Sequence, residues 1–430
     1  MPSDPTHAPN KLPVTGLLLT GGGARAAYQV GVLEAIADIR KAAGAQRQAN
    51  PFPIITGTSA GAINASALAC GADDFDATVR LIAGVWRGFH ADQIYRADSL
   101  SMLRSGATWM TLLSLGWVVA KWRRIKPRSL LDNSPLAELL RQLVPLERLP
   151  YLIRRGHMKA LAVTASSYSS GQHVTFFEGD KRLLPWVRSQ RLAVRDKITH
   201  AHLLASSAIP FVFPATELPI SGHSEYFGDG SMRQSAPVAP VIHLGAERIL
   251  VVGAGRMHEP KNEAHLHTSS SYPSLAQIAG HALSNIFLDA LAVDVERVRR
   301  INHTLTLVPP EARNSSALRP LKLLLISPSK RLDAIAARHV DTLPAAVRTM
   351  LAAIGVSSKA ADAKGAALAS YLLFESGYTQ ELMALGYADA MLQRAEVCEF
   401  FDWDDPEVAC RPDSAQPPRV ERRVDPLRLR

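Results

Sequence analysis

Two short apolar segments, each followed at once by a glycine-rich turn and a helix-forming stretch, constrain the fold of this chain most. Residues 14–20 lead into three glycines and the helical stretch 26–44, and residues 53–56 lead into the pentapeptide 57–61 and a second strong helix former. Fully apolar strands that alternate with helices are typical of a parallel sheet covered on both faces. The sequence therefore predicts an α/β fold with a mainly parallel central sheet.

Similar segments continue along the chain. We expect further strands at 159–165, 173–178, 226–231, 247–254 and 321–327. From about residue 257 helical patterns dominate, and we expect helices at 274–303 and at roughly 330–340, 344–355 and 364–395. The strand at 321–327 is expected to extend the same sheet.

This pattern divides the chain into parts. A flexible tail is expected at 1–13, an α/β domain at 14–255 and a mainly helical region packed on it at 256–410. Within the α/β domain, 86–131 is a candidate lid or membrane-contact insertion. The segment 411–430 holds four prolines and six arginines against three acids, so we expect a disordered basic tail.

Composition excludes several classes of protein. With 47% hydrophobic and 20% charged residues, most of the chain is expected to fold around packed cores. The three cysteines lie far apart and no pair has metal-ligand spacing, so we expect neither a disulfide framework nor a metal site. The N-terminus shows no signal-peptide pattern, and a cytoplasmic location is expected.

The net charge of +9 is compatible with attraction to nucleic acid or to anionic membranes. Residues 99–131 contain six basic residues and no acid, and the apolar run 107–120 lies among them. About 20 apolar residues are needed to span a bilayer, so this run is too short. It is either a buried helix with a solvated basic end or a peripheral contact with an anionic membrane through 107–128. No nucleic-acid-binding motif is present, and no nucleic-acid partner is expected.

The pentapeptide 57–61 fits the pattern G-x-S-x-G between a predicted strand and a predicted helix. In that context a sharp turn pushes the serine hydroxyl out at the end of the sheet. Ser59 is therefore a candidate nucleophile. The sharp turn around it, called a nucleophile elbow, is expected to consist of its four small neighbours Gly57, Thr58, Ala60 and Gly61. The alternative is that Ser59 is an ordinary helix N-cap.

The glycine stretch 21–23 also lies at a strand-to-helix junction, where exposed backbone N–H groups bind phosphate or a developing oxyanion. A dinucleotide fingerprint needs a final glycine where Ala26 stands, and an acid after the next strand. A phosphate P-loop needs a Gly-Lys-Ser/Thr sequence that is absent. An oxyanion hole beside a serine nucleophile fits better, and a nucleotide- or phosphate-binding protein remains an alternative.

A serine nucleophile needs a base. Asp229 lies between two glycines at the end of a predicted strand, and His243 follows 14 positions later on a predicted helix. Asp229 is the stronger candidate, although Asp-Gly is also a common turn pair.

Four motifs in order carry a resemblance to a known family. They are the glycine motif 21–25, the serine motif 57–61, the stretch 205–210 (ASSAIP) and Asp-Gly at 229–230. Together they resemble the patatin-like phospholipase family over about 14–255. The resemblance implies a three-layer α/β/α fold and calcium-independent hydrolysis of acyl esters in phospholipid or acylglycerol, with no cofactor.

The resemblance also implies roles for individual residues. Ser59 is the nucleophile and Asp229 the proton acceptor of a dyad without histidine. The implied oxyanion hole is formed by Gly21, Gly22, Gly23 and Arg25. The chain departs from the family pattern at two positions. The family usually has glycine where this chain has Ala26, and alanine or glycine where it has Ser231. Both replacements are small, so we expect them to tune the activity and not to abolish it. A lipid transacylase with the same site and a catalytically silent lipid-binding protein are the alternatives.

Overall fold

The computed structural model describes residues 13–96, 129–220, 222–256, 275–315, 318–353, 356 and 363–404. Three regions singled out from the sequence lie wholly or mainly outside this set: the N-terminal tail up to residue 12, residues 97–128 of the candidate insertion with the 107–128 membrane-contact segment, and the basic tail 411–430.

A ten-stranded sheet forms the centre of the protein. Five neighbouring strands are parallel, in the order β10 (Lys322–Ile326), β9 (Arg248–Val252), β1 (Thr15–Leu19), β2 (Ile54–Thr58) and β3 (Ala160–Ser167). Beyond β3 the sheet is mixed and contains β4 (His173–Gly179), β6 (Arg191–Arg195) and β5 (Val187–Arg188). The remaining strands are β7 (Thr216–Ile220) and β8 (His223–Asp229), and β8 pairs with β3.

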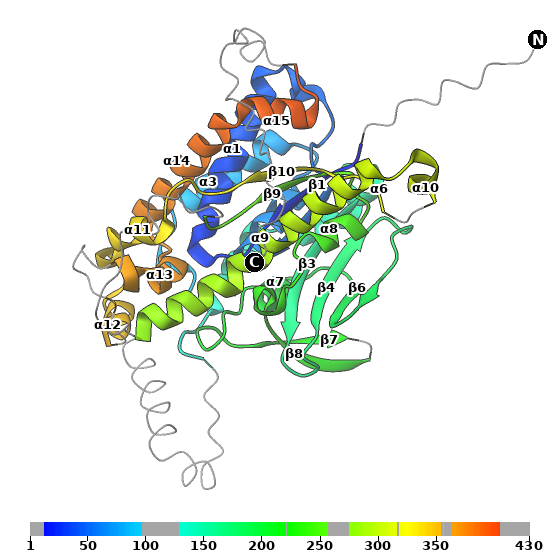
Figure 1. Ribbon diagram of the computed structural model, residues 1–430. Coiled ribbons are helices and arrows are strands. Elements are labelled where there is room, and N and C mark those ends of the chain that lie inside the picture. Colours follow the sequence, from blue (N-terminus) through cyan, green and yellow to red (C-terminus); the bar gives the residue numbers. More distant parts are fainter. Residues whose placement is uncertain are drawn as a thin grey trace, which may run out of the picture.

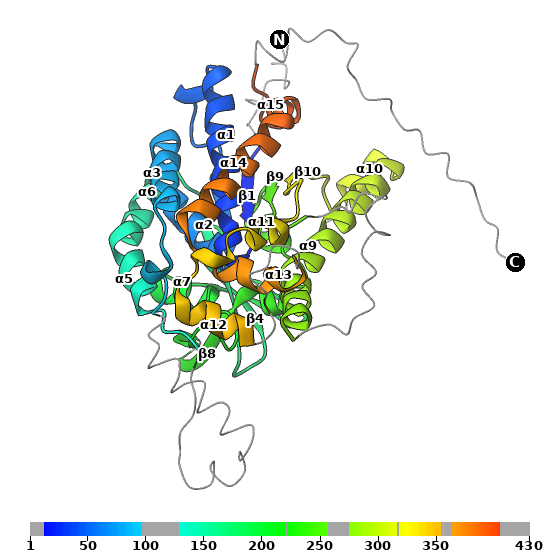
Figure 2. The same ribbon diagram turned by 90° about the vertical axis from the view of Figure 1, so that its left-hand side faces the viewer.

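Helices cover both faces of the sheet. Figure 2 shows β1 and β9 between two helical layers, with α1, α2, α3 and α14 on one side and α9 and α10 on the other. The helices before residue 256 are α1 (Ala27–Ala42), α2 (Ala60–Cys70), α3 (Phe75–Arg87), α5 (Ser134–Leu143), α6 (Leu149–Arg155), α7 (His200–Ser206) and α8 (Ala239–His243). Those after it are α9 (Leu275–Leu307), α10 (Pro310–Asn314), α11 (Leu332–Ala337), α12 (Ala345–Ala353), α13 (Ala363–Leu372), α14 (Ser376–Leu392) and α15 (Arg394–Phe401). The predicted α/β/α class is confirmed (Figure 1).

Side-chain alternation along the central strands builds two cores. On β1, Leu17 and Leu19 belong to the larger core beneath α1, α2 and α14, whereas Leu18 belongs to the smaller core that contains residues of α8 and α9. Successive strand residues point to opposite faces, so a strand of five buried residues feeds both cores. The uninterrupted apolar character of these segments follows from this double burial.

The C-terminal helices pack directly on the first helix of the chain. A Cβ atom on Gly31 of α1 would lie 1.9 Å from the carbonyl oxygen of Met383 in α14, and one on Gly386 would lie 2.1 Å from that of Tyr28. The backbones of α1 and α14 therefore touch. The helical pattern expected at 364–395 is interrupted between Leu372 and Ser376, where the chain turns and contacts the cavity described below.

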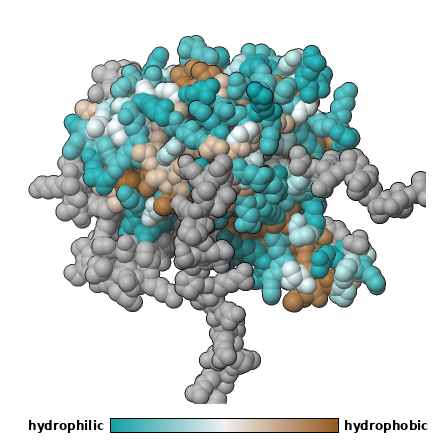
Figure 3. Space-filling view, turned by 90° about the horizontal axis from the view of Figure 1, so that it is seen from above, coloured by the Kyte–Doolittle hydropathy of each residue, from teal (hydrophilic) through white to brown (hydrophobic). Residues whose placement is uncertain are grey.

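Hydrophilic side chains dominate the face seen from above, with hydrophobic residues in small separate groups (Figure 3). Within the part of the chain that the structure describes, no helix combines the length and the hydrophobicity needed to cross a bilayer.

Candidate active site

Ser59 occupies a strained turn between β2 and α2. Its φ is 56° and its ψ is −134°, a combination that is rare for residues with a side chain. A Cβ atom on Gly57 would lie 2.5 Å from the Cα of Ala62, and one on Gly61 would lie 2.4 Å from a backbone oxygen. The turn therefore requires glycine on both sides. Ser59 makes no side-chain capping hydrogen bond to α2, so it is not an ordinary N-cap.

The backbone of this turn is held by Ser206, at the end of α7. The N–H of Ser59 donates to Ser206 Oγ at 2.8 Å, and that hydroxyl donates to the carbonyl oxygen of Thr164 at 2.6 Å. All three residues are buried. Ser206 belongs to the 205–210 motif, and the structure gives it a clear part in fixing the elbow.

Strand register brings Asp229 close to the serine. β2 and β8 pair with the same edge of β3, one after the other. The last pair of β2 with β3 is Thr58 with Thr164, and the next residue of β3, Ala165, pairs with Asp229 of β8. Ser59, which follows Thr58, and Asp229 therefore occupy successive positions along the same edge. Gly230 permits this approach, because a Cβ there would lie 2.1 Å from the carbonyl oxygen of Thr164.

The Asp229 side chain is completely buried. Its Oδ1 accepts a hydrogen bond of 2.8 Å from the N–H of Ser231. Burial raises the pKa of the Asp229 carboxyl to about 6, and interactions with Ser59 and Ser231 oppose this rise. Oδ2 has no hydrogen-bond partner of good geometry among the described residues. The Ser59 hydroxyl therefore interacts with the carboxyl group, but the two do not form a hydrogen bond of good geometry. Long or poorly aligned catalytic hydrogen bonds are common in unliganded sites.

Neither His243, the histidine considered from the sequence, nor the buried His173 reaches the cavity at Ser59. His173 pairs with Ser166 on β3, one position from Ala165, so its side chain points to the face of the sheet opposite Asp229. Burial lowers its pKa to about 4, so the imidazole is neutral at pH 7. His243 stacks on Trp186 at 4.8 Å between ring centroids, beside the smaller core.

The glycine stretch after β1 faces the same cavity as the serine. Gly23 has a φ of 55°, and a Cβ there would lie 2.3 Å from the carbonyl oxygen of Tyr371. Gly23 begins a short 3-10 helix and Ala60 begins α2. First-turn N–H groups have no acceptor within their own helix. Both residues line the cavity together with Ser59.

Arg25 points away from the cavity. Its Nε donates to Ser370 Oγ at 2.7 Å, and its guanidinium carbon lies 4.1 Å from the centre of the Tyr371 ring. The backbone N–H of Arg25 donates to the carbonyl oxygen of Gly22 at 3.1 Å. The side chain thus ties the glycine stretch to α13. Gly21 and Gly22 complete the stretch, and Gly22 packs tightly against Ala254.

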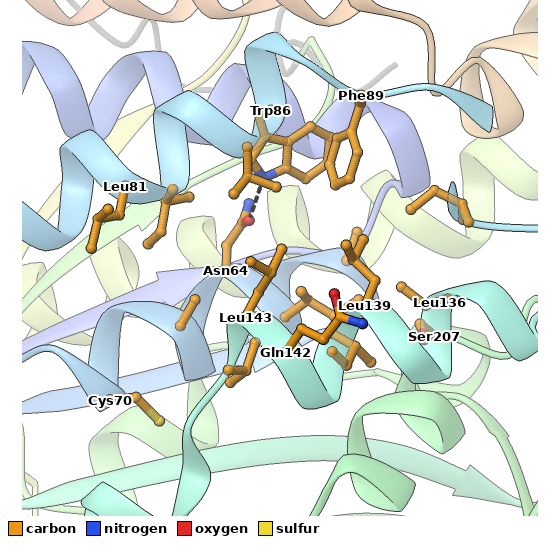
Figure 4. Close-up of a pocket in the computed structure, with 18 of the residues that line it drawn as sticks. Asn64, Cys70, Leu81, Trp86, Phe89, Leu136, Leu139, Gln142, Leu143 and Ser207 are labelled. Carbon is orange, nitrogen blue, oxygen red and sulfur yellow. Dashed lines mark hydrogen bonds between the residues drawn. The ribbon is translucent and has the colours of Figure 1, made fainter. Parts of the chain in front are cut away.

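A cavity of about 340 Å³ extends from Ser59 between α2, α3 and α5. Its lining is mainly apolar (Figure 4). Asn64 also lines it, but the amide is satisfied: Oδ1 accepts from Trp86 Nε1 at 2.9 Å, and Nδ2 donates to Ala26 and Gln29 at 3.2 Å each. The buried amide therefore links α2 to the start of α1 and to α3, and its polar atoms are satisfied without a partner in the cavity.

Residues far along the chain complete the cavity wall. Phe374, between α13 and α14, lines the cavity, and Tyr95 donates from its hydroxyl to the carbonyl oxygen of Leu372 at 2.9 Å. No motif in the sequence points to Phe374, Asn64 or Trp86 as part of the site. An asparagine within the apolar helix after the serine was the one signal for this network.

Among the described residues, no three His, Cys, Asp or Glu side chains gather as metal ligands.

The fold and this geometry define an α/β protein with a serine in a strained strand-to-helix turn, beside a buried carboxyl group and an apolar cavity. A family model described as patatin-like phospholipase matches residues 17–242, more than half of the chain, and the chain belongs to this family. The family assignment supports a lipid hydrolase, and the resemblance noted in the sequence is confirmed.

One solved structure that matches is that of VipD from Legionella pneumophila. It is 13% identical, with a TM-score of 0.31, and the match covers 86% of this chain and 67% of that one; this likeness is too distant to support a statement about function. The comparison with curated proteins gives no match.

Proposed function

We propose that this protein is a lipid acyl hydrolase of the phospholipase A type, with Ser59 as nucleophile and Asp229 as proton acceptor. The observation that carries the proposal is the adjacent placement of the strained Ser59 turn and the fully buried Asp229 carboxyl beside an apolar cavity. A carboxyl with a pKa near 6 is mostly ionised at pH 7 and is more basic than an ordinary aspartate, which suits a general base.

The proposed reaction has two halves. Ser59 Oγ attacks the ester carbonyl carbon while its proton passes to Asp229, and the carbonyl oxygen becomes an oxyanion. The C–O bond to the alcohol then breaks, and the leaving lyso-lipid or alcohol takes the proton from Asp229. Water attacks the acyl-enzyme in the same way, which releases the fatty acid and restores both residues.

We assign the oxyanion hole to backbone N–H groups of the glycine stretch 21–23 and of Ala60. Removal of one such donor typically costs about 3–4 kcal/mol in transition-state stabilisation. Arg25 contributes in this proposal by holding the stretch in place, since its side chain is engaged by α13.

The apolar cavity is proposed to bind the acyl chain of a phospholipid or acylglycerol. Among the polar side chains that line it, Asn64 and Trp86 bond to each other, so an acyl chain beside them leaves neither of them unpaired.

Covalent labelling tests the proposal. A fluorophosphonate probe with intact-mass analysis is expected to add one adduct to the wild type, none to Ser59→Ala, and to react more slowly with Asp229→Asn. Ser66→Ala is the matched control, because Ser66 is a buried serine of α2, the helix that follows Ser59. Equal labelling of Ser59→Ala and wild type contradicts the assignment of the nucleophile.

The remaining alternatives separate in the same experiment. Labelling without fatty-acid release from phospholipid, but with acyl transfer to an added alcohol, identifies a transacylase. A folded wild type that is never labelled, with or without anionic vesicles, identifies a silent lipid-binding protein.

We also propose a peripheral contact with anionic membranes through the basic residues of 107–128. Each basic residue near an anionic surface contributes about 1 kcal/mol. Charge reversal of Arg123, Arg124 and Lys126 to glutamate is expected to weaken binding to phosphatidylserine vesicles. Unchanged binding contradicts this contact.

A further inference from the structure

The floor of the apolar cavity is one face of a single helix. Ser59, Ala60, Ile63, Ala67 and Cys70 line the cavity at helical spacing, so the cavity follows α2 from its first turn to its last. The 11 residues of α2 rise by about 16 Å in total at 1.5 Å each. The cavity is therefore a groove with the nucleophile at one end.

The walls of this groove come from two helices. Ile82 and Val85 belong to α3, and Leu136 and Leu139 belong to α5. Leu81 of α3 and Leu143 of α5 are the exposed apolar members of the lining, at 73% and 43% exposure. Figure 4 shows Leu81 and Cys70 on the side of the groove away from Ser207, which lies at the nucleophile end.

The apolar character stops at the far end. Beyond Cys70, Thr78 Oγ1 donates to the carbonyl oxygen of Gly71 at 2.8 Å, and Arg148 forms an ion pair of 2.8 Å with Asp73. Thr78 and Arg148 both line the groove. An apolar chain end pushed into this region displaces water from charged groups without replacing their hydrogen bonds, which is unfavourable.

We propose that α2 measures the length of the acyl chain, with Cys70 as the last apolar contact that α2 provides and the Thr78–Arg148 end as the stop. The inference rests on the proposed function and adds substrate selection to it. An extended chain advances slightly less than one 1.5 Å bond length per carbon, so about 16 Å holds roughly 12 carbons. The protein therefore prefers medium-length acyl chains.

The small side chain of Ala67 keeps the middle of the groove open. Helical side chains lean toward the N-terminus of their helix, so a larger residue at position 67 covers the floor back toward Ile63. Ala67→Phe then leaves room for roughly 5 carbons, since the 4 residues from Ser59 to Ile63 rise by about 6 Å. Cys70→Leu blocks only the last turn and leaves roughly 8 carbons on the same scale.

The test is the acyl-length profile of kcat/KM with p-nitrophenyl butanoate, octanoate, dodecanoate and hexadecanoate below their micelle concentrations. For the wild type we expect a rise of up to about fourfold per added methylene that ends near dodecanoate. Cys70→Leu is expected to lose tenfold or more (about 1.4 kcal/mol) on dodecanoate and to keep octanoate. Ala67→Phe is expected to lose tenfold or more in kcat/KM on octanoate, and its kcat/KM on butanoate is expected to stay within about twofold of the wild-type value.

Ala388→Phe is the matched control, because Ala388 is an exposed helical alanine of α14 outside the groove lining. An unchanged profile in both groove variants overturns the proposal. The proposal is also overturned if Ala67→Phe loses its activity on butanoate although its thermal unfolding matches that of the control. In that case the acyl chain does not follow α2.

Failure of the proposed function has a different signature. If the wild type hydrolyses no ester and Ser59 is not labelled, fatty-acid binding is measured by calorimetry on the Ser59→Ala protein. Dodecanoate binding that weakens tenfold or more in Ser59→Ala/Ala67→Phe still supports the length selection. Equal binding of all chain lengths by both proteins overturns it.

Discussion

Replacement of Asp229 by asparagine is expected to abolish activity and to stabilise the fold. The carboxyl is fully buried and its pKa is about 6, against an ordinary value of 3.8. Asparagine has the same shape and keeps an oxygen to accept the 2.8 Å hydrogen bond from the Ser231 N–H, but it carries no charge to bury.

The magnitude follows from proton linkage. Between about pH 4 and pH 6 the native state keeps a proton that the unfolded state has already lost, so the stability of the wild type falls as the pH rises. Below this window the carboxyl is protonated in both states, and above it the full difference of about 2 pKa units remains. At about 1.4 kcal/mol per unit, the ionised carboxylate costs about 3 kcal/mol at pH 8.

Urea unfolding of wild type and Asp229→Asn at pH 4, 5 and 8 measures this difference. We expect nearly equal stability at pH 4 and an advantage of about 3 kcal/mol for the variant at pH 8. In parallel, kcat/KM of the wild type is expected to rise about tenfold per pH unit below pH 6 and to level off above it. The reasoning about burial is refuted if the difference in unfolding free energy between Asp229→Asn and wild type is no larger at pH 8 than at pH 4.

Three further predictions concern the groups that support the site. Gly23→Ala is expected to lower kcat at least a hundredfold, because its Cβ meets a backbone oxygen at 2.3 Å; Gly44→Ala, with positive φ but open space, is expected to cost about 1 kcal/mol of stability and no activity. Ser206→Ala removes the acceptor of the Ser59 backbone N–H, and we expect a loss of about 1–3 kcal/mol in urea unfolding together with slower fluorophosphonate labelling. Ser370→Ala unpairs the buried Arg25 Nε and is expected to lower kcat with little change in KM, whereas an unchanged kcat shows that the glycine stretch holds its shape without α13.

The local parts of the site were predictable because they depend on local backbone rules. Gly57 and Gly61 flank a turn that only glycine fits, and such a turn is visible as a spacing between an apolar strand and a helix. Asp229 was visible in the same way, as an acid followed by a glycine at the end of a strand. The central strands were predictable since burial on both faces makes them uniformly apolar.

Long-range contacts were not predictable. The adjacency of Ser59 and Asp229 depends on which residues of β3 each strand pairs with, and one sequence does not contain strand register. The orientation of Arg25 depends on Ser370, 345 positions away. The expected helix at 364–395 is two helices, because the chain turns near Phe374, which lines the cavity. The helical periodicity of the sequence gives no sign of this turn.

The position of β1 in the sheet has a consequence for how the chain folds as it is made. β1 pairs with β2 on one side and with β9 on the other, and β9 ends at residue 252, 194 positions after β2 ends at residue 58. At roughly 5–20 residues per second, a growing chain carries the second edge of this apolar strand unpaired for about 10–40 seconds. Unpaired edges of this kind promote aggregation. The yield of folded protein is therefore expected to depend on the speed of translation and on chaperones that shield the nascent chain.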